Sequence, residues 1–150
     1  MSATKKNTII KGKRKATIIL HSGDFDKIMS AFITGNGFLA MGVPVTIFFT
    51  FWGLKALTKN GFKKAPLSKM NFFGLGRKMI NSKMKKYNVA DLDTLAKSFK
   101  QLGGRITACT MTMQLMGIKE KDLRTDLISD LGSVGAYCYE SIDANITLFI

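Results

Sequence analysis

Cys109 is the residue whose type and surroundings point most directly to chemistry. It lies in the segment GRITACTMTMQLMG at residues 104–117, which predicts a buried strand at 105–108 followed at once by a helix at 110–116. A thiol at such a junction faces unpaired backbone N–H groups and the positive end of the helix dipole, and both favour the thiolate. The thiolate is the reactive form of cysteine. We therefore expect Cys109 to be a reactive and accessible sulfur atom.

The segments after two further strands should form a site with Cys109. The apolar, β-branched runs at 16–20 and 45–49 are typical of central strands in a parallel sheet. In such sheets, ligands bind outside the carboxyl ends of the strands. The loops at 22–24 and 51–53 should therefore meet the start of the helix that follows Cys109. We expect a substrate-binding site formed by Ser22, Gly23, Trp52 and Thr110.

The remaining pattern predicts an α/β domain with a mostly parallel central sheet. A chain of 150 residues is most simply one domain, here residues 16–150 after a basic N-terminal arm at residues 1–15. Residues 62–87 form a Met- and Lys-rich insertion with some helix around 77–87. Besides the strands already named, we expect a final strand at 145–150, and helices at 25–41, 54–59, 91–102, 121–126 and 132–144.

The positive charge of the chain is large and unevenly distributed. The formal net charge is +13, and no acidic residue occurs from Lys27 to Ala90, a stretch that carries ten Lys or Arg residues between Lys55 and Lys86. Such a surface attracts nucleic acid, anionic lipid, an acidic protein or an anionic sulfur compound, or it is simply solvated. Aromatic residues are not interleaved with the lysines as a stacking platform would require, which disfavours nucleic acid. Peripheral membrane contact stays open.

Several other sites are excluded or weak. There is no Cys-x-x-Cys pair and no phosphate-binding P-loop, and the dinucleotide-like pattern at 35–40 falls inside an expected helix, so we expect neither a metal nor a cofactor. The uncharged run at 28–54 is interrupted by glycines and Pro44, and a buried helix followed by a strand explains it. With no visible signal peptide, a reducing cytoplasm is the expected location.

His21 and Cys138 could each assist Cys109, but each has a simpler interpretation. His21 could form a Cys–His pair, although a hydrogen-bonded structural role is the more common one for a single histidine. Cys138 lies in the expected helix at 132–144. A buried structural thiol is the simpler interpretation of it, and a resolving cysteine that forms a disulfide with Cys109 is the more specific alternative.

Six segments carry a family resemblance: Leu20–Lys27, Phe48–Leu54, Pro66–Asn71, Ala108–Met113, Leu115–Ile118 and Asn145–Ile150. They resemble the DsrE/DsrF-like sulfur-carrier family, and within it the branch often labelled as peroxiredoxin-family or DsrE-family proteins. The resemblance runs from about Ala16 to Ile150. It implies a flavodoxin-like, three-layer fold, assembly into a homo-oligomer, and a cysteine, here Cys109, that carries sulfur as a persulfide.

The sequence therefore predicts an intracellular sulfur carrier or sulfurtransferase. Its partners would be sulfur donor and acceptor proteins or small anionic sulfur compounds. The alternatives are a basic module that binds nucleic acid or membrane, with a structural cysteine, and a thiol peroxidase-like redox protein. The chain departs from the family pattern at Cys138, where similar proteins tend to have an aliphatic residue. No Pro and Thr precede Cys109 at the spacing that a peroxidatic cysteine has.

Overall fold

A computed structural model of the chain describes residues 14–150, so the predicted basic arm lies almost wholly outside the described residues. Within them, five strands form one sheet in the order β4-β3-β2-β1-β5, and every pair of neighbouring strands is parallel. The strands are β1 (Ala16–Leu20), β2 (Val45–Phe49), β3 (Arg105–Cys109), β4 (Asp130–Gly132) and β5 (Ile146–Phe149).

Helices connect these strands at nearly the expected places. The longest is α1, whose sixteen residues begin at Phe25 as predicted. The α-helices are α1 (Phe25–Ala40), α2 (Phe51–Ala56), α3 (Gly61–Lys64), α4 (Leu75–Lys86), α5 (Leu92–Gln101), α6 (Thr110–Met116) and α7 (Val134–Ile142), with short 3₁₀ turns η1 (Phe72–Gly74) and η2 (Glu120–Asp122).

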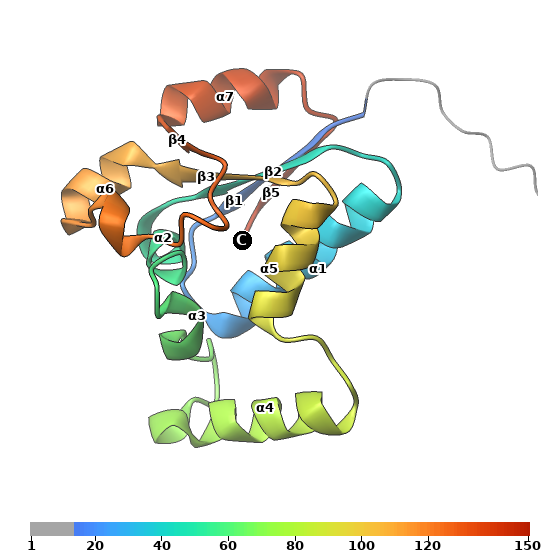
Figure 1. The fold of residues 1–150 in the computed structure, drawn as a ribbon, viewed down its shortest axis with the longest axis vertical. Helices are drawn as coiled ribbons and strands as arrows, with labels where there is room; N and C mark the ends of the chain where they lie inside the picture. The colour runs from blue at the N-terminus through green and yellow to red at the C-terminus, as the bar shows by residue number, and fades with distance from the viewer. Residues whose placement is uncertain (1–13) are drawn as a thin grey trace, which may run out of the picture.

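The strand order decides which face of the sheet each helix covers. From β1 to β4 the chain moves steadily across the sheet, so right-handed crossovers place α1 and α5 on one face. The connection from β4 back to β5 runs the other way and places α7 on the opposite face, as Figure 1 shows. The structure confirms the predicted single-domain, three-layer α/β fold with a parallel sheet.

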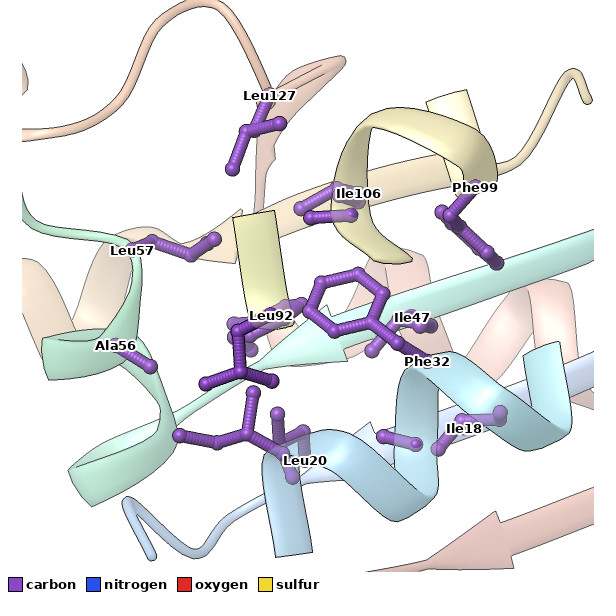
Figure 2. Close-up of a cluster of buried hydrophobic side chains, with 14 of the residues drawn as sticks. Ile18, Leu20, Phe32, Ile47, Ala56, Leu57, Leu92, Phe99, Ile106 and Leu127 are labelled. Carbon is purple, nitrogen blue, oxygen red and sulfur yellow. The ribbon is translucent and has the colours of Figure 1, made fainter. Parts of the chain in front are cut away.

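The main hydrophobic core lies between the sheet and the α1–α5 layer (Figure 2). Phe32 of α1 packs edge-on against Phe99 of α5, with 5.8 Å between the ring centroids. Two glycines make room for Phe99, because a Cβ atom on Gly35 or Gly104 would lie 2.7 or 2.4 Å from its ring. The apolar runs of the central strands therefore fill a thick layer on this face.

The helix expected at 132–144 is confirmed as α7 with a later start, but two other features near the end of the chain differ from the prediction. The helix expected at 132–144 begins only at Val134, and Asp130–Gly132 forms the edge strand β4 instead. This strand is held by an ion pair between Arg105 and Asp130 and by backbone pairing with β3. The helix expected at 121–126 is reduced to the single 3₁₀ turn η2.

The long uncharged run of the sequence is divided between secondary structure elements. It supplies most of α1, all of β2 and the first turns of α2. Among the described residues, no helix combines the length and the apolar character that a membrane crossing requires.

Replacing the N-cap of α5 should destabilise the protein in a pH-dependent way. The Asp91 carboxylate accepts a hydrogen bond from the Thr94 backbone N–H at 2.8 Å, and this bond is the main reason that the pKa of Asp91 lies below its ordinary value. We expect Asp91→Ala to cost about 1 kcal/mol of unfolding free energy near neutral pH, measured by urea denaturation. A carboxyl group with a lowered pKa stabilises the fold above its unfolded pKa, and this stabilisation fades as the pH falls through the folded value.

Asp91→Asn is the matched control, because an amide caps the helix without titrating. It should retain most of the stability and show no pH dependence from this position. An Asp91→Ala deficit of the same size at acidic and neutral pH would contradict the assignment of a charged cap.

Candidate functional site

The exits of β1 and β2 are packed backbone against backbone. Gly53 donates its N–H to the His21 carbonyl at 2.8 Å, and a Cβ atom there would lie 2.2 Å from the Leu20 carbonyl oxygen. A Cβ atom on Gly23 would lie 2.7 Å from the Trp52 carbonyl oxygen. The structure therefore brings these two segments together at the carboxyl edge of the sheet, as the sequence predicts.

Helix α6 is hydrogen-bonded to the same edge of the sheet through one buried threonine. The Thr112 hydroxyl accepts the Phe51 N–H at 3.2 Å and lies 3.0 Å from the Thr50 hydroxyl. Phe51 has a φ of 45°, a left-handed conformation that is costly for a bulky side chain. The turn from β2 is so tight that residues 51–53, predicted as a loop, already form the first turn of α2.

A cavity of about 540 Å³ opens at this edge, and three of the four predicted ligand-binding residues line it. Trp52 is about half exposed, and the Lys55 ammonium lies 4.7 Å from the centroid of its ring. Lys64 adds a second cation and Asp24 one carboxylate, which accepts the Ser22 hydroxyl at 3.0 Å, to an otherwise mainly apolar wall with a net positive charge. The cavity can therefore hold a small molecule with an apolar body and a negative group. The three predicted residues are Ser22, Gly23 and Trp52.

Thr110 belongs to a different cavity. It lines a space of about 360 Å³ beside α6, and its hydroxyl donates to the Gly132 carbonyl at 3.4 Å. Ile118 lies on the walls of both cavities, so the two are neighbours. The structure thus separates Thr110 from the other three residues.

Cys109 occupies the predicted junction, but its side chain is not accessible. It is the last residue of β3 and the N-cap of α6, and its relative exposure is 0%. It packs with Phe48 and Tyr137, and partly buried Ile19 lies against this group. The expectation of an accessible sulfur atom is therefore wrong for this conformation.

Strand alternation explains the burial of Cys109. Ala108 belongs to the main core with α1 and α5, so the next side chain along β3 faces the opposite side of the sheet. That side is covered by α7, whose Tyr137 ring lies 5.0 Å from the Phe48 ring, centroid to centroid. Cys109 therefore lies beneath α7 and does not line the cavity at the loop edge.

Helix α7 is attached to the sheet mainly by polar contacts. Tyr137 is its one buried residue, and the Tyr137 hydroxyl donates to the Thr17 hydroxyl at 3.4 Å. Glu140 accepts from Thr46 at 2.6 Å and pairs with the Lys15 ammonium at 3.3 Å. Arg105 lies 3.8 Å from the same carboxylate.

Packing under α7 is also incomplete. A cavity of about 180 Å³ lies between this helix and β2, β3 and β4, next to the Phe48–Tyr137 pair. One carboxylate oxygen of Asp130 is buried there without a hydrogen-bond partner among the described residues. A helix with few buried apolar contacts opens more easily than one that packs on a filled core.

The structure also revises the roles considered for His21 and Cys138. The His21 ring lies between Phe51 and Phe149, at 5.0 and 5.7 Å between centroids, and the apolar group around Cys109 does not include it. Cys138 is exposed on α7, so the interpretation as a buried structural thiol is wrong. Both cysteines are free thiols.

Three residues that shape the site were not identified from the sequence: Phe48 and Tyr137, which cover Cys109, and Thr112, which fastens the strand exits. The alternation of Ile106 and Ala108 with Thr107 and Cys109 is visible in the sequence and places the cysteine on the second face. The identity of the covering helix has no comparable local signal, because it depends on where β4 and β5 join the sheet.

Comparison with known proteins assigns the family. A model of the DsrE/DsrF/DrsH-like family matches residues 12–65 and 58–149. The chain belongs to this family. It is 41% identical over 157 residues to the uncharacterized protein YrkE of Bacillus subtilis (strain 168), with 91% of this chain and 97% of that protein covered. It is 26% identical over 131 residues to the sulfur carrier protein DsrE2 of Allochromatium vinosum, with 73% and 82% covered.

Solved structures show the same fold at low sequence identity. The ychN protein from E. coli superimposes with a TM-score of 0.59 at 11% identity, with 91% of this chain and 99% of that chain covered. Protein MTH1491 from Methanobacterium thermoautotrophicum, described as of unknown function, superimposes with a TM-score of 0.56 at 12% identity, with the same coverage of both chains. These likenesses concern the fold alone.

The two cysteines should differ sharply in their reaction with an alkylating reagent. In the native protein we expect rapid modification of Cys138 and slow modification of Cys109, limited by the opening of α7. Tyr137→Ala, which removes the ring over Cys109, should increase the modification rate of Cys109 by at least about tenfold and leave the rate of Cys138 unchanged. Peptide mass spectrometry over a time course measures both rates.

Tyr137→Phe is the matched control, since it keeps the ring over Cys109 and removes only the hydroxyl bond to Thr17. Its effect on the Cys109 rate should be much smaller. Equal native rates for the two cysteines, or a Cys109 rate insensitive to Tyr137→Ala in a protein that is still folded, would show that α7 does not control access.

Proposed function

We propose that this protein is a sulfur carrier that accepts sulfane sulfur on Cys109 and passes it on to an acceptor thiol. The observation that carries the proposal is the place of Cys109, between the carboxyl end of β3 and the first residue of α6, in a chain of the DsrE/DsrF/DrsH-like family. The relative DsrE2, which is named a sulfur carrier protein, adds support.

The transfer is a thiol–persulfide exchange. The Cys109 thiolate attacks the outer sulfur of a donor persulfide, so a bond forms between Sγ and that sulfur while the donor's S–S bond breaks. The donor leaves as a thiolate and takes up the proton that Cys109 released. An acceptor thiolate then attacks the outer sulfur in the same manner, and Cys109 returns as the leaving thiolate. No external oxidant or reductant is consumed, and no acid–base array is required.

Movement of α7 is part of this proposal, because a buried Sγ cannot meet a donor. In the closed conformation the Cys109 side chain accepts no hydrogen bond from the N–H groups at the start of α6, so the proposal requires that water and the donor first reach the sulfur. In the closed state, the Phe48–Tyr137 pair shields the sulfur from other thiols and oxidants. A carrier benefits from both states, since it must hold an exchangeable sulfur between two encounters.

Donor and acceptor proteins, or small anionic sulfur compounds, are the proposed partners. Lys55 and Lys64 at the cavity lined by Trp52 supply positive charge that can attract an anionic compound or an acidic surface to this edge of the sheet, although Cys109 does not line that cavity. Homo-oligomer assembly stays a prediction from the family resemblance. A thiol peroxidase that pairs Cys109 with Cys138 is not favoured by any contact, because one thiol is buried under α7 and the other is exposed.

Loading with inorganic polysulfide and intact-mass measurement test the proposal. The wild-type protein should gain the mass of one or more sulfur atoms, and reduction with a thiol should remove them. Cys109→Ser should lose the adduct, whereas the matched variant Cys138→Ser should retain it. Because exposed Cys138 can react adventitiously, the decisive comparison is the adduct in Cys138→Ser. An adduct that survives Cys109→Ser and disappears in Cys138→Ser would refute the assignment.

A further inference from the structure

We propose that α4 and the turn before it form a docking surface for membranes that contain anionic lipids. This surface, formed by residues 70–86 and called here the α4 surface, has an apolar part whose large side chains are exposed to solvent. Phe73 is fully exposed, and Phe72 and Leu75 are 71% and 67% exposed. Two methionines, Met70 and Met79, extend it. Clustered apolar residues of this size at a protein surface mark an interaction site.

The backbone holds these side chains in costly conformations. Met70, Phe72 and Phe73 have φ values of 57°, 20° and 52°, in or at the border of the left-handed region that non-glycine residues rarely adopt. A turn that only connected two elements would carry glycine or asparagine at such positions. Three large apolar residues in strained positions favour a role for their exposed side chains.

Helix α4 is anchored to the domain along one side only. Arg77 lies over the Phe25 ring at 3.3 Å and donates to the carbonyls of Ala65 and Phe62 at 2.6 and 3.2 Å. Ile80 and Met84, on the same side of the helix, pack against the core. Figure 1 shows α4 as a separate helix below the body of the domain, on the side away from α7.

The other side of α4 carries uncompensated positive charge. Lys78, Lys83 and Lys86 are exposed, and within residues 14–150 none of them forms an ion pair. Lys85 instead lines the groove between α4 and the start of α5, which Asp91 and Asp93 also line. No acidic residue lies between Lys27 and Ala90 in the sequence. The α4 surface thus combines an apolar end, at residues 70–79, with a cationic end, at residues 78–86.

This combination fits a lipid surface better than other partners. A second copy docked through the same surface could cover the apolar end but would offer the lysines no acidic partner, because residues 70–86 contain no carboxylate. Nucleic acid would use the lysines and could stack bases on Phe72 and Phe73, but Met70, Leu75 and Met79 would have no partner in it, whereas a lipid surface takes up all five apolar side chains. At a membrane, apolar side chains enter the boundary between head groups and acyl chains, and lysines contact lipid phosphates. Docking by α4 would leave α7, on the far side of the molecule, free for other partners.

Vesicle flotation of the full 150-residue chain tests this inference. We expect binding to vesicles of mixed phosphatidylcholine and phosphatidylglycerol, weak or no binding to phosphatidylcholine alone, and release at high salt. The triple variant Lys78→Gln, Lys83→Gln, Lys86→Gln should weaken binding by roughly 100-fold. Phe72→Ser combined with Phe73→Ser should also abolish most binding, although it leaves the charge intact.

Matched controls use exposed residues of the same types elsewhere on the chain. Lys97→Gln, Lys119→Gln, Lys121→Gln removes three exposed lysines away from α4, and Tyr139→Ser with Ile142→Ser removes two exposed apolar residues of α7. Neither should reduce vesicle binding as the α4 variants do. In a Trp52→Phe background, Phe73→Trp should give a fluorescence blue shift with anionic vesicles.

An equal loss of vesicle binding in the α4 variants and the control variants would overturn the inference, because it would indicate a non-specific charge effect. Binding that is unchanged by Phe72→Ser and Phe73→Ser, or salt-sensitive binding to RNA without binding to vesicles, would also overturn it. Sulfur loading of Cys109 is measured separately by mass, so failure of either proposal leaves the other intact.

Discussion

The topology of the sheet is the constraint on which the rest of the structure depends. Strands β1 to β4 follow one another across the sheet, and β5 pairs with the opposite side of β1. Helices α1 and α5 therefore cover one face of the sheet, and α7 covers the other. The first face is a thick aromatic and aliphatic core. On the second, the buried group consists of Phe48, Cys109 and Tyr137. The nucleophile of the proposed site thus lies in the thin layer, under a helix held mainly by hydrogen bonds and ion pairs.

This arrangement combines a rigid edge with the movable cover that the proposed function requires. The exits of β1 and β2 are locked together by close backbone packing at Gly23 and Gly53 and by the hydroxyl of Thr112, which leaves little freedom around the cavity lined by Trp52. Helix α7 lacks such locking and covers a cavity. A carrier needs this pairing of a fixed reactive atom with a cover of low stability, since the sulfur must be sheltered and then released.

Much of the fold could be predicted from local pattern, and the failures have physical reasons. The runs at β1 and β2, the Asp91 cap and the junction of β3 with α6 carry signals within a few residues. Strand β4 was missed because Asp130-Leu131-Gly132 lacks a strand-like composition and is held by Arg105 from a distant segment. The predicted Phe51–Gly53 loop became helix because Phe51 adopts a left-handed turn. The burial of Cys109 depends on β4 and α7, so it could not be predicted while β4 was missing from the predicted sheet.

Hydrogen exchange of α7 before and after sulfur loading tests the central claim most directly. In Cys138→Ser, a persulfide on Cys109 must displace part of the Phe48–Tyr137 cover, because Sγ has no solvent-exposed surface. The account predicts faster amide exchange in Val134–Ile142 on loading, with β1 and β2 unchanged. A Cys109 persulfide that forms while α7 keeps its full protection would contradict the account, and so would a cysteine that does not load at all.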